Sequence, residues 1–333
     1  MKKLIDENKP QYKANLHCHS VHSDGCWTPQ QIKEEYKKRG YSIVAITDHE
    51  HLLNHSALNE DSFIFLTGYE LYVRDLPFDY LNYPQSHINL YSKTPENKML
   101  YYTPSITKYI PKRELENLQY HKLVEKRELS VEFMREMIAF AKERGFLVCH
   151  NHPTWSFETE KDAPSYDGCF AMEIYNHGAY QMGYCEYNQH YYDYQLNRGL
   201  DMALVASDDN HNPTRNPYED SFGGMTYILA DSFDYDGIID ALEKRNFYAS
   251  TGPQIFALTV ENGALTVKTS EVERIVFVTN NHHRKAEYSK DGNPVTFAQF
   301  EVSDKDKWVR VEVVDFSGKR AFSRAYRIAE LLE

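Results

Sequence analysis

Residues 42–49 read Ser-Ile-Val-Ala-Ile-Thr-Asp-His, an apolar run that ends in a carboxylate and an imidazole. A short continuous apolar run is typical of a parallel strand that is buried on both faces of its sheet. Similar runs recur along the first two-thirds of the chain. We predict strands at Lys13–His17, Ser42–Thr47, Phe63–Thr67, His87–Tyr91, Phe146–Cys149, Phe170–Tyr175, Met202–Ala206 and Met225–Ala230.

Helical patterns lie between these runs. Residues 28–40 open with the capping-box sequence Thr-Pro-Gln-Gln and end at a glycine. Ser130 can cap a second helix, which Gly145 ends, and Asp234–Arg245 forms a third. This alternation of strands and helices implies a parallel sheet, either open or closed into a barrel.

The pattern changes after about Thr251. Asn262-Gly263 lies between two apolar runs, which is a strong signal for a hairpin. The predicted strands of this part are Ile255–Val260, Ala264–Lys268, Arg274–Thr279, Val295–Phe300, Trp308–Val314 and Arg320–Ile328. We therefore predict an α/β domain over residues 11–250, with an insertion at 92–129, and a small antiparallel β-sandwich domain over residues 253–333.

The 333 residues include 37 Lys and Arg against 49 Asp and Glu, for a formal charge of −12. A surface this acidic argues against nucleic acid as the main partner, and 41% hydrophobic residues exclude a disordered chain. Residues 1–13 lack the apolar stretch of a secretory signal, and no run has the length that spans a bilayer. Five cysteines without a C-x-x-C pair are typical of a reducing compartment, so we predict a cytoplasmic protein.

The chain contains 15 histidines, and many of them lie with acids at the ends of the predicted strands. In a parallel α/β barrel, the loops that follow the strands form one face, where residues distant in sequence converge. Side chains two positions apart on an extended segment point the same way, so His17 and His19 can chelate one ion. The residues predicted at this face are His17, His19, Asp24, His49, Glu70, His87, His152, Asp209 and His211.

Each of these residues has an ordinary structural role as its alternative. His17 and His19 could be an exposed pair on an edge strand, and Asp24 could be a turn residue. Six histidines and three acids at one face would, however, repel one another and lose hydration unless cations compensate them. These nine ligands exceed the needs of one ion, so the pattern predicts two or three divalent metal ions.

The motifs follow one another in a defined order between residues 12 and 215: HCH (17–19), SDG (23–25), TDHE (47–50), GYE (68–70), HINLY (87–91), HNHP (150–153) and SDDNH (207–211). This order resembles the PHP (polymerase and histidinol phosphatase) superfamily of metal-dependent phosphoesterases. The stretch RNFYASTGP (245–253) is most similar to the carbaryl-hydrolase-like branch of that superfamily. The resemblance implies a distorted (β/α)7 TIM-like barrel, which has fewer strands than the runs predicted here.

The resemblance also implies how the ions are held. His150 lies two residues before His152 and is an alternative ligand, but the His-Pro pair favours His152. The metals implied are zinc, manganese or iron. The implied ligand sets are His17, His19, Glu70 and Asp209 for one ion, Glu70, His87 and His152 for a second, and Asp24, His49 and His211 for a third.

The activity implied is hydrolysis of a small organic phosphate ester by a metal-activated hydroxide. Many members carry an arginine soon after the His-Pro pair, and this chain has none there, so hydrolysis of a carbamate or carboxyl ester is an alternative. A non-catalytic, metal-containing binding protein is a second alternative. A small molecule, in the first case a phosphorylated one, is the expected partner, and the sequence indicates no oligomeric state.

Other residues near the strand ends are candidates for the remaining roles. One of His22, His51 and His177 could protonate the leaving group, although the sequence does not select among them. The predicted substrate contacts are Trp155, Tyr175, Asn176 and Arg215, with Arg74 as a further cation.

Overall fold

The structure is a computed structural model that describes residues 1–74, 85–104, 106, 108–115 and 119–332. Its strands are β1 (Lys2–Ile5), β2 (Tyr12–Asn15), β3 (Ile43–Ile46), β4 (Ile64–Val73), β5 (Ser86–Ser92), β6 (Met99–Tyr102), β7 (Gln119–Leu123), β8 (Phe146–His150), β9 (Ala171–Asn176), β10 (Ala203–Ser207), β11 (Met225–Ile228), β12 (Phe247–Ser250), β13 (Ile255–Glu261), β14 (Ala264–Val272), β15 (Arg274–Thr279), β16 (Lys285–Tyr288), β17 (Val295–Glu301), β18 (Trp308–Val314), β19 (Arg320–Phe322) and β20 (Tyr326–Arg327). Its helices are α1 (Pro29–Lys37), α2 (Lys112–Leu115), α3 (Val131–Glu143), α4 (His177–Gln181), α5 (Gln189–Asn197), α6 (Tyr235–Glu243) and α7 (Ile328–Leu332), with 3-10 turns at Ser56–Leu58 and Ala163–Tyr166.

A mixed sheet of 14 strands runs through the molecule in the order β10-β9-β8-β5-β4-β3-β2-β11-β12-β19-β18-β15-β16, with β20 beside β18. Every apolar run predicted as a strand in residues 11–250 is a strand of this sheet. The predicted helices are confirmed as α1, α3 and α6. Thr28 and Gln31 form the predicted capping box at the start of α1. The strands β1, β6, β7, β12 and β16 were not predicted.

Strand direction departs from the all-parallel prediction at two places, β5 and β11, and β11 pairs antiparallel with β2. The strands β2, β3 and the first half of β4 are parallel, as are β8, β9 and β10. Between these two blocks, β5 runs antiparallel to both β4 and β8. An apolar run indicates that a strand is buried but not in which direction it runs, so the sequence could not distinguish parallel from antiparallel pairing. The reversal brings the start of β5 beside the carboxyl ends of its neighbours.

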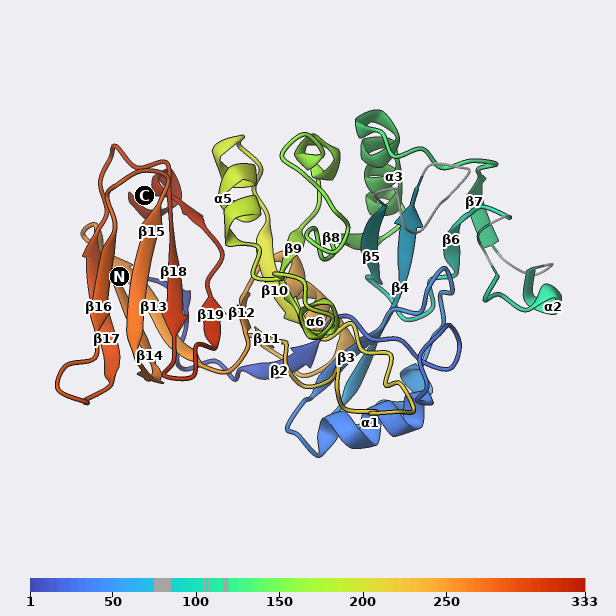
Figure 1. Cartoon of the computed structure of the whole chain (residues 1–333), viewed down its shortest axis with the longest axis horizontal. Helices are drawn as coiled ribbons and strands as arrows, with labels where there is room; N and C mark the ends of the chain where they lie inside the picture. Colours follow the sequence, from blue (N-terminus) through green and yellow to red (C-terminus); the bar gives the residue numbers. More distant parts are fainter. Residues whose placement is uncertain (75–84, 105, 107, 116–118, 333) are drawn as a thin grey trace.

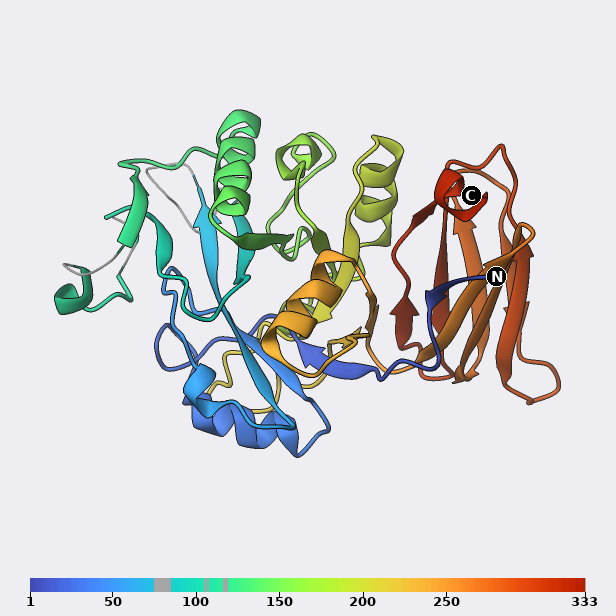
Figure 2. The same ribbon diagram turned by 180° about the vertical axis from the view of Figure 1, so that it is seen from behind.

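The sheet curls, so that β10, at one end of the strand order, lies beside β11, which is near the middle of that order. Thr226 of β11 accepts a hydrogen bond from the amide of Ala206 in β10 and donates one to its carbonyl. Beyond the strand ends, the His19 amide donates to the Asn210 carbonyl, and the Asp209 amide donates to the His17 carbonyl. In the described residues, no backbone ladder joins β10 to β11, so the closed barrel stays a prediction. From behind, α6 lies against the curled part of the sheet, and its Ile238 and Leu242 pack into the apolar cluster there (Figure 2).

The strands after residue 253 are antiparallel. A sheet of four strands, β1-β13-β14-β17, packs on β15 and β18 through buried side chains such as Val267, Phe277 and Val311. The N-terminal strand β1 belongs to this part, since Lys2 pairs with Val260 (Figure 1). The main sheet continues into it, because β12 pairs with β19. The division into domains at residues 250 and 253 stays a prediction.

The predicted insertion lies at the opposite end of the molecule from β13–β19 (Figure 1). Its described residues contain the parallel pair β6 and β7 and the short helix α2. In the described part of the chain, no helix has the length and apolar character needed to cross a membrane.

Candidate metal centre

The nine predicted ligand residues come together at one rim of the sheet. His17 and His19 follow β2, His49 follows β3, His152 follows β8, and Asp209 follows β10. Glu70 lies within β4, beyond the part that pairs with β3. His87 reaches the same rim from the start of β5, because that strand runs in the opposite direction.

The first predicted set is tightly packed and almost wholly buried. His17 Nε2 lies 3.3 Å from Glu70 Oε1 and 3.1 Å from Asp209 Oδ1. His19 Nε2 lies 3.0 Å from the same oxygen of Asp209 and 3.4 Å from Glu70 Oε2. One potential ligand atom from each of these four residues lies within 4.8 Å of the others, which is compact enough for a single ion.

Glu70 is the common neighbour of the first two predicted sets. Its Oε1 lies 2.9 Å from His87 Nδ1 and 3.3 Å from His152 Nε2, as well as facing His17. Its Oε2 lies 2.9 Å from His49 Nδ1. Its Oε1 thus faces His87 and His152 of the second predicted set together with His17 of the first. The clustered donor atoms, however, group Glu70 and His87 with His49, and group His152 with His17 and Glu173.

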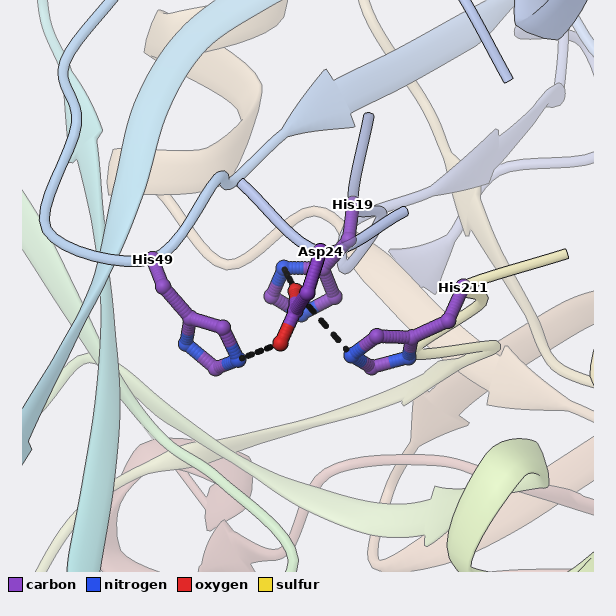
Figure 3. Close-up of side chains that lie close together, drawn as sticks. All are labelled: His19, Asp24, His49 and His211. Carbon is purple, nitrogen blue, oxygen red and sulfur yellow. Dashed lines mark ion pairs between the residues drawn. The ribbon is translucent and has the colours of Figure 1, made fainter. Parts of the chain in front are cut away.

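The third set lies nearer the surface. Asp24 lies between the imidazoles of His19, His49 and His211 (Figure 3). Its Oδ2 is 3.4 Å from His49 Nε2, and its Oδ1 is 3.5 Å from His211 Nε2 and 3.8 Å from His19 Nδ1. The geometry adds His19 to the set that the sequence predicted, so His19 faces two groups through its two ring nitrogens.

Burial and mutual charge shift the pKa of these residues in opposite directions. Burial would raise the pKa of Glu70, but His87, His17 and His49 lower it well below its usual value. Burial would lower the pKa of His17, but Asp209, Glu70 and Glu173 raise it well above its usual range. Burial alone would also lower the pKa of His49, which Glu70 and Asp24 raise to about 9. Without a cation, protons on imidazoles must balance the buried carboxylates.

Not every imidazole carries such a proton. Burial, together with His211 and His49, lowers the pKa of His19 to about 4. Burial likewise lowers the pKa of His87 to about 4, against the opposite effect of Glu70. Neutral imidazole and ionised carboxylate are the protonation states that bind metals.

The donor atoms fit divalent metal ions. The Nε2 atoms of His17 and His19 face each other at 3.2 Å, and two ring nitrogens at this distance need a proton or a cation between them. His19 Nδ1 is buried without a hydrogen-bond partner among the described residues, and its nearest carboxylate oxygen, Asp24 Oδ1, lies 3.8 Å away. Burial of an unpaired polar atom is costly, and an ion in this position removes that cost. A mixed set of imidazole nitrogen and carboxylate oxygen donors suits divalent metal ions.

Glu173 in β9 also contacts the cluster, and it was not among the predicted site residues. Its Oε1 accepts a hydrogen bond from His17 Nδ1 at 2.8 Å, which directs Nε2 of that ring into the cluster. Its Oε2 accepts from the His152 amide at 2.9 Å. A carboxylate behind a ligating histidine fixes the orientation of the ring and raises its basicity. The available signal was a single acid inside the apolar run Phe170–Tyr175.

Asp209 has the strained backbone conformation typical of functional positions, with φ of 54°. Its neighbour Asp208 points elsewhere and accepts hydrogen bonds from the amides of Phe222, Gly223 and Gly224. Burial raises the pKa of Asp208 to about 6, against these hydrogen bonds. The two adjacent acids therefore have different partners: Asp209 faces the imidazoles, and Asp208 binds the loop before β11.

The structure separates His152 from His150. His152 Nε2 faces Glu70, whereas His150 Nε2 lies 2.8 Å from Glu158 and its ring stacks on Tyr166. His150 belongs to none of the groups of clustered ligand atoms in the described residues. This arrangement favours His152, as the His-Pro pair did.

A cavity of about 950 Å³ opens over the cluster, and its wall includes His49, Glu70, His87, Asp209 and His211. Two of the predicted substrate contacts, Trp155 and Arg215, line it, and so does Arg74. The Trp155 ring lies 4.9 Å from His87 and 4.7 Å from His152, measured between centroids. Arg215 is paired with Glu219 at 2.7 Å and its side chain is 80% exposed.

Tyr175 and Asn176 are not among the residues described on the cavity wall. Asn176 donates hydrogen bonds to Glu173 at 2.9 Å and to Asp209 at 3.2 Å, so it holds the ligand cluster together. The Tyr175 hydroxyl lies 2.8 Å from His177 Nδ1. Their role as substrate contacts stays a prediction.

The three candidate general acids are also absent from the described wall of the cavity. His22 stacks on His55 with centroids 5.7 Å apart, and His51 Nδ1 lies 3.3 Å from the His22 carbonyl. His177 faces Tyr175. None of the three is placed beside the ligand cluster by these contacts.

The fold and the site define a mixed α/β chain with adjoining groups of residues that could hold metal ions, and several of these residues line a cavity. No protein-family model matches the chain, and no curated protein matches it. Among solved structures, it is similar to a two-domain protein containing a predicted PHP-like metal-dependent phosphoesterase from Bacteroides vulgatus, with 16% identity, 98% of each chain covered and a TM-score of 0.44.

Two further solved structures are similar. A putative metal-dependent phosphoesterase from Bifidobacterium adolescentis matches 61% of this chain and 89% of its own, with 18% identity and a TM-score of 0.40. An amidohydrolase from Chromobacterium violaceum matches 70% of this chain and 96% of its own, with 14% identity and a TM-score of 0.41. Likenesses at this level do not define an activity, so the function has to be argued from the site itself.

Proposed function

We propose that this chain is a metal-dependent hydrolase that cleaves a phosphoric ester of a small organic molecule. The observation that carries the proposal is the adjacency of the ligand groups. One group of clustered donor atoms contains His17, His19, Glu70 and Asp209, and it shares Glu70 with a second group and His19 with a third. Structural metal sites are closed and need few ligands, whereas adjoining sites beneath an open cavity are typical of hydrolysis.

The ligand assignment is part of the proposal. One ion is held by His17, His19, Glu70 and Asp209, a second by Glu70, His87 and His152, and a third by Asp24, His49 and His211. When bound, such ions supply an activated water and positive charge for the oxygens of the substrate. Glu173 orients His17 through Nδ1, and the Asp209 carbonyl orients His211 in the same way at 3.0 Å. Trp155 lines the cavity beside His87 and His152.

The cavity supports an anionic substrate despite the acidic chain. Its described wall includes the cations Arg74, Lys108 and Arg215. The same wall carries the carboxylates of Asp24, Glu70, Asp209, Glu219 and Asp220, so the cations favour a negatively charged molecule once metal ions neutralise the acids of the cluster. The proposed partner is therefore a small phosphorylated compound.

Hydrolysis of a carbamate or carboxyl ester is the second candidate. This candidate is favoured by the position of Arg215. Its side chain is mostly exposed and its charge is already paired with Glu219, so it is not held ready to bind a phosphate group. The residues after His152, namely Pro153-Thr154-Trp155-Ser156, also provide no cation.

One panel distinguishes the two candidates. The metal content of the purified protein is measured first, and hydrolysis of p-nitrophenyl phosphate, its bis-ester and a 1-naphthyl carbamate is then followed with Mn, Zn and Fe. We expect turnover of a phosphate ester that is lost in His17→Ala. Carbamate turnover without phosphate turnover would support the second candidate. Less than one metal ion per chain, unchanged by His17→Ala, would refute the proposed site.

A further inference from the structure

Asp24 differs from the other proposed ligands in how it is held. It lies in the turn at Ser23-Asp24-Gly25 rather than at the end of a strand, and its side chain is 36% exposed. Its closest ring nitrogen is His49 Nε2 at 3.4 Å, whereas Glu70 approaches two imidazoles at 2.9 Å. The cluster itself therefore constrains this carboxylate less than the buried ones.

Ser23 Oγ donates to Asp24 Oδ1 at 3.3 Å, and a residue from a remote segment holds the other oxygen. The Tyr109 hydroxyl donates a hydrogen bond to Asp24 Oδ2 at 3.2 Å. The Tyr109 ring is also nearly parallel to the His49 imidazole, with 6.0 Å between centroids and 19° between planes. With Oδ2 engaged in this way, Asp24 Oδ1 is directed toward His211 and His19.

The segment that carries Tyr109 is anchored beside the same site. Arg127 is fully buried and forms a double ion pair with Glu50, at 2.6 Å for Nη1 and 2.9 Å for Nη2. Arg127 also donates to the carbonyl oxygens of Tyr72 at 2.7 Å and Tyr101 at 3.1 Å. Glu50 directly follows the proposed ligand His49, so the base of the insertion is tied to the metal-binding rim.

A second contact fixes the segment close to Tyr109. The hydroxyl of Tyr72, in β4, donates to the Ile106 carbonyl at 3.2 Å. The insertion is thus held from two sides by residues of the main sheet and the loop that follows β3. Its position is specified by buried polar contacts, which are geometrically demanding.

From these contacts we infer that Tyr109 is a positioning residue that holds Asp24 in its metal-binding orientation, so that the insertion completes the outermost metal site. The inference rests on the proposed function and adds a residue to that site from a segment without any predicted ligand. Groups that hold metal ligands in place typically contribute about 10- to 100-fold in metal affinity.

The test measures metal binding and needs no substrate. The metal-free full-length chain is titrated with Mn²⁺, free Mn²⁺ is followed by electron paramagnetic resonance, and the wild type is compared with Tyr109→Phe, Asp24→Asn and the double variant. We expect Tyr109→Phe to bind one class of Mn²⁺ about 10-fold or more weakly and the other ions normally. Asp24→Asn should weaken the same class, and the double variant should be no weaker than Asp24→Asn.

Tyr218→Phe is the matched control, because Tyr218 also lines the cavity but its hydroxyl contacts Glu35 at 3.5 Å. We expect its Mn²⁺ affinity to equal that of the wild type. Equal thermal unfolding of all variants in EDTA establishes that the loss is local. The inference is overturned by wild-type affinity in Tyr109→Phe, by additive losses in the double variant, or by a wild-type chain that binds no Mn²⁺. A chain that shows the Tyr109-dependent class but hydrolyses no ester would overturn the proposed function alone.

Discussion

Glu173 offers the most direct test of the site at the scale of a single residue. Glu173→Gln keeps every proposed ligand but weakens the contact that orients His17 through Nδ1. It also places an amide where Glu173 Oε2 accepts from the His152 amide and Asn176. We expect metal affinity to fall by about 10- to 100-fold, measured by competition with a chelating dye.

A matched control is Glu158→Gln. Glu158 also contacts a histidine, since its Oε2 lies 2.8 Å from His150 Nε2, but neither residue belongs to the ligand cluster. We expect its metal affinity to remain that of the wild type. Equal losses in the two variants would show that the effect of Glu173 is a general effect of removing a buried acid.

His177 makes a pH-dependent contribution to stability. Burial, with a smaller effect of Lys319, lowers its pKa from 6.5 to about 4. The unfolded chain therefore binds a proton near pH 6.5 that the folded chain binds only near pH 4, so the free energy of unfolding falls as the pH falls through this window. The difference between the two pKa values of His177 limits this loss of unfolding free energy to about 3 kcal/mol.

His177→Gln should remove that loss. Glutamine retains a donor and an acceptor for Tyr175 and Gln181, which contact the ring nitrogens at 2.8 and 3.2 Å. Urea unfolding of the metal-free protein at pH 7 and pH 4.5 should show a smaller acid loss in the variant than in the wild type. Parallel losses in the two proteins would contradict the assignment.

Most of the proposed ligands could be predicted from the sequence because they stand beside recognisable apolar runs, whereas Asp24 lies in a turn. His17 and His19 follow a strand, and their alternation places both rings on one side. Glu173 could not be assigned in this way, since a lone acid within a strand does not reveal which partner it has. The candidate general acids could not be distinguished for the same reason: a histidine in a loop, such as His22, carries no signal of the direction in which it points.

Among the elements, β4 has a double role because it joins the two blocks of the sheet. Its residues 64–67 pair with β3, and its residues 68–73 pair with β5. The change of partner falls at Gly68, where an added Cβ would lie 2.8 Å from the Leu90 carbonyl oxygen. A side chain at this position must push β5 away from β4, close to Glu70 and His87.

We therefore expect Gly68→Ala to lower the free energy of unfolding by about 1–3 kcal/mol, as forced packing against backbone does. Gly252→Ala is the control, since its Cβ would meet chiefly the flexible Lys319 side chain, at 2.9 Å. We expect the control to change stability by less than about 0.5 kcal/mol in the same urea titrations. A Gly68→Ala protein as stable as the wild type would show that β5 can shift without cost.

The ends of the elements were easier to predict than their directions. Thr28 and Ser130 accept the hydrogen bonds expected of helix caps, because capping is decided by residues a few positions apart. The direction of β5 depends on its neighbours in space, and the run His87–Tyr91 is equally apolar in either direction. The sequence thus placed His87 correctly at a strand end. It could not show that β5 runs antiparallel to its neighbours, which is why the start of this strand, and not its end, lies at the site.

At the scale of the whole molecule, a buried ion pair links α5 to β18. Arg310 donates to Asp193 through Nε at 2.8 Å and Nη2 at 3.0 Å, and only 3% of its side chain is exposed. Removing one partner of a buried pair costs about 3–5 kcal/mol, although Glu312 remains 3.3 Å from the guanidinium. We expect Asp193→Ala to lower the free energy of unfolding by about 2 kcal/mol or more, with unchanged metal stoichiometry.

The control is Glu7→Ala, which breaks the pair between Glu7 and Lys268. Both side chains are about half exposed, so the loss should be below about 1 kcal/mol. Thermal unfolding with bound Mn²⁺ and metal analysis of the same samples test both expectations. A loss of metal from Asp193→Ala would show that the two parts of the molecule are coupled through this junction.

The pairing of β1 with β13 has a consequence for the order in which the molecule can form. During synthesis, residues 2–5 emerge about 250 residues before their partner strand at residues 255–261. The strand β12 likewise can pair only after β19 has been synthesised. Folding from the N-terminus therefore leaves strand edges open for much of translation, and such edges are prone to mispairing. A fragment cut between residues 250 and 253 would keep these edges open permanently, so it would be a poor substitute for the full chain in any experiment on the metal site.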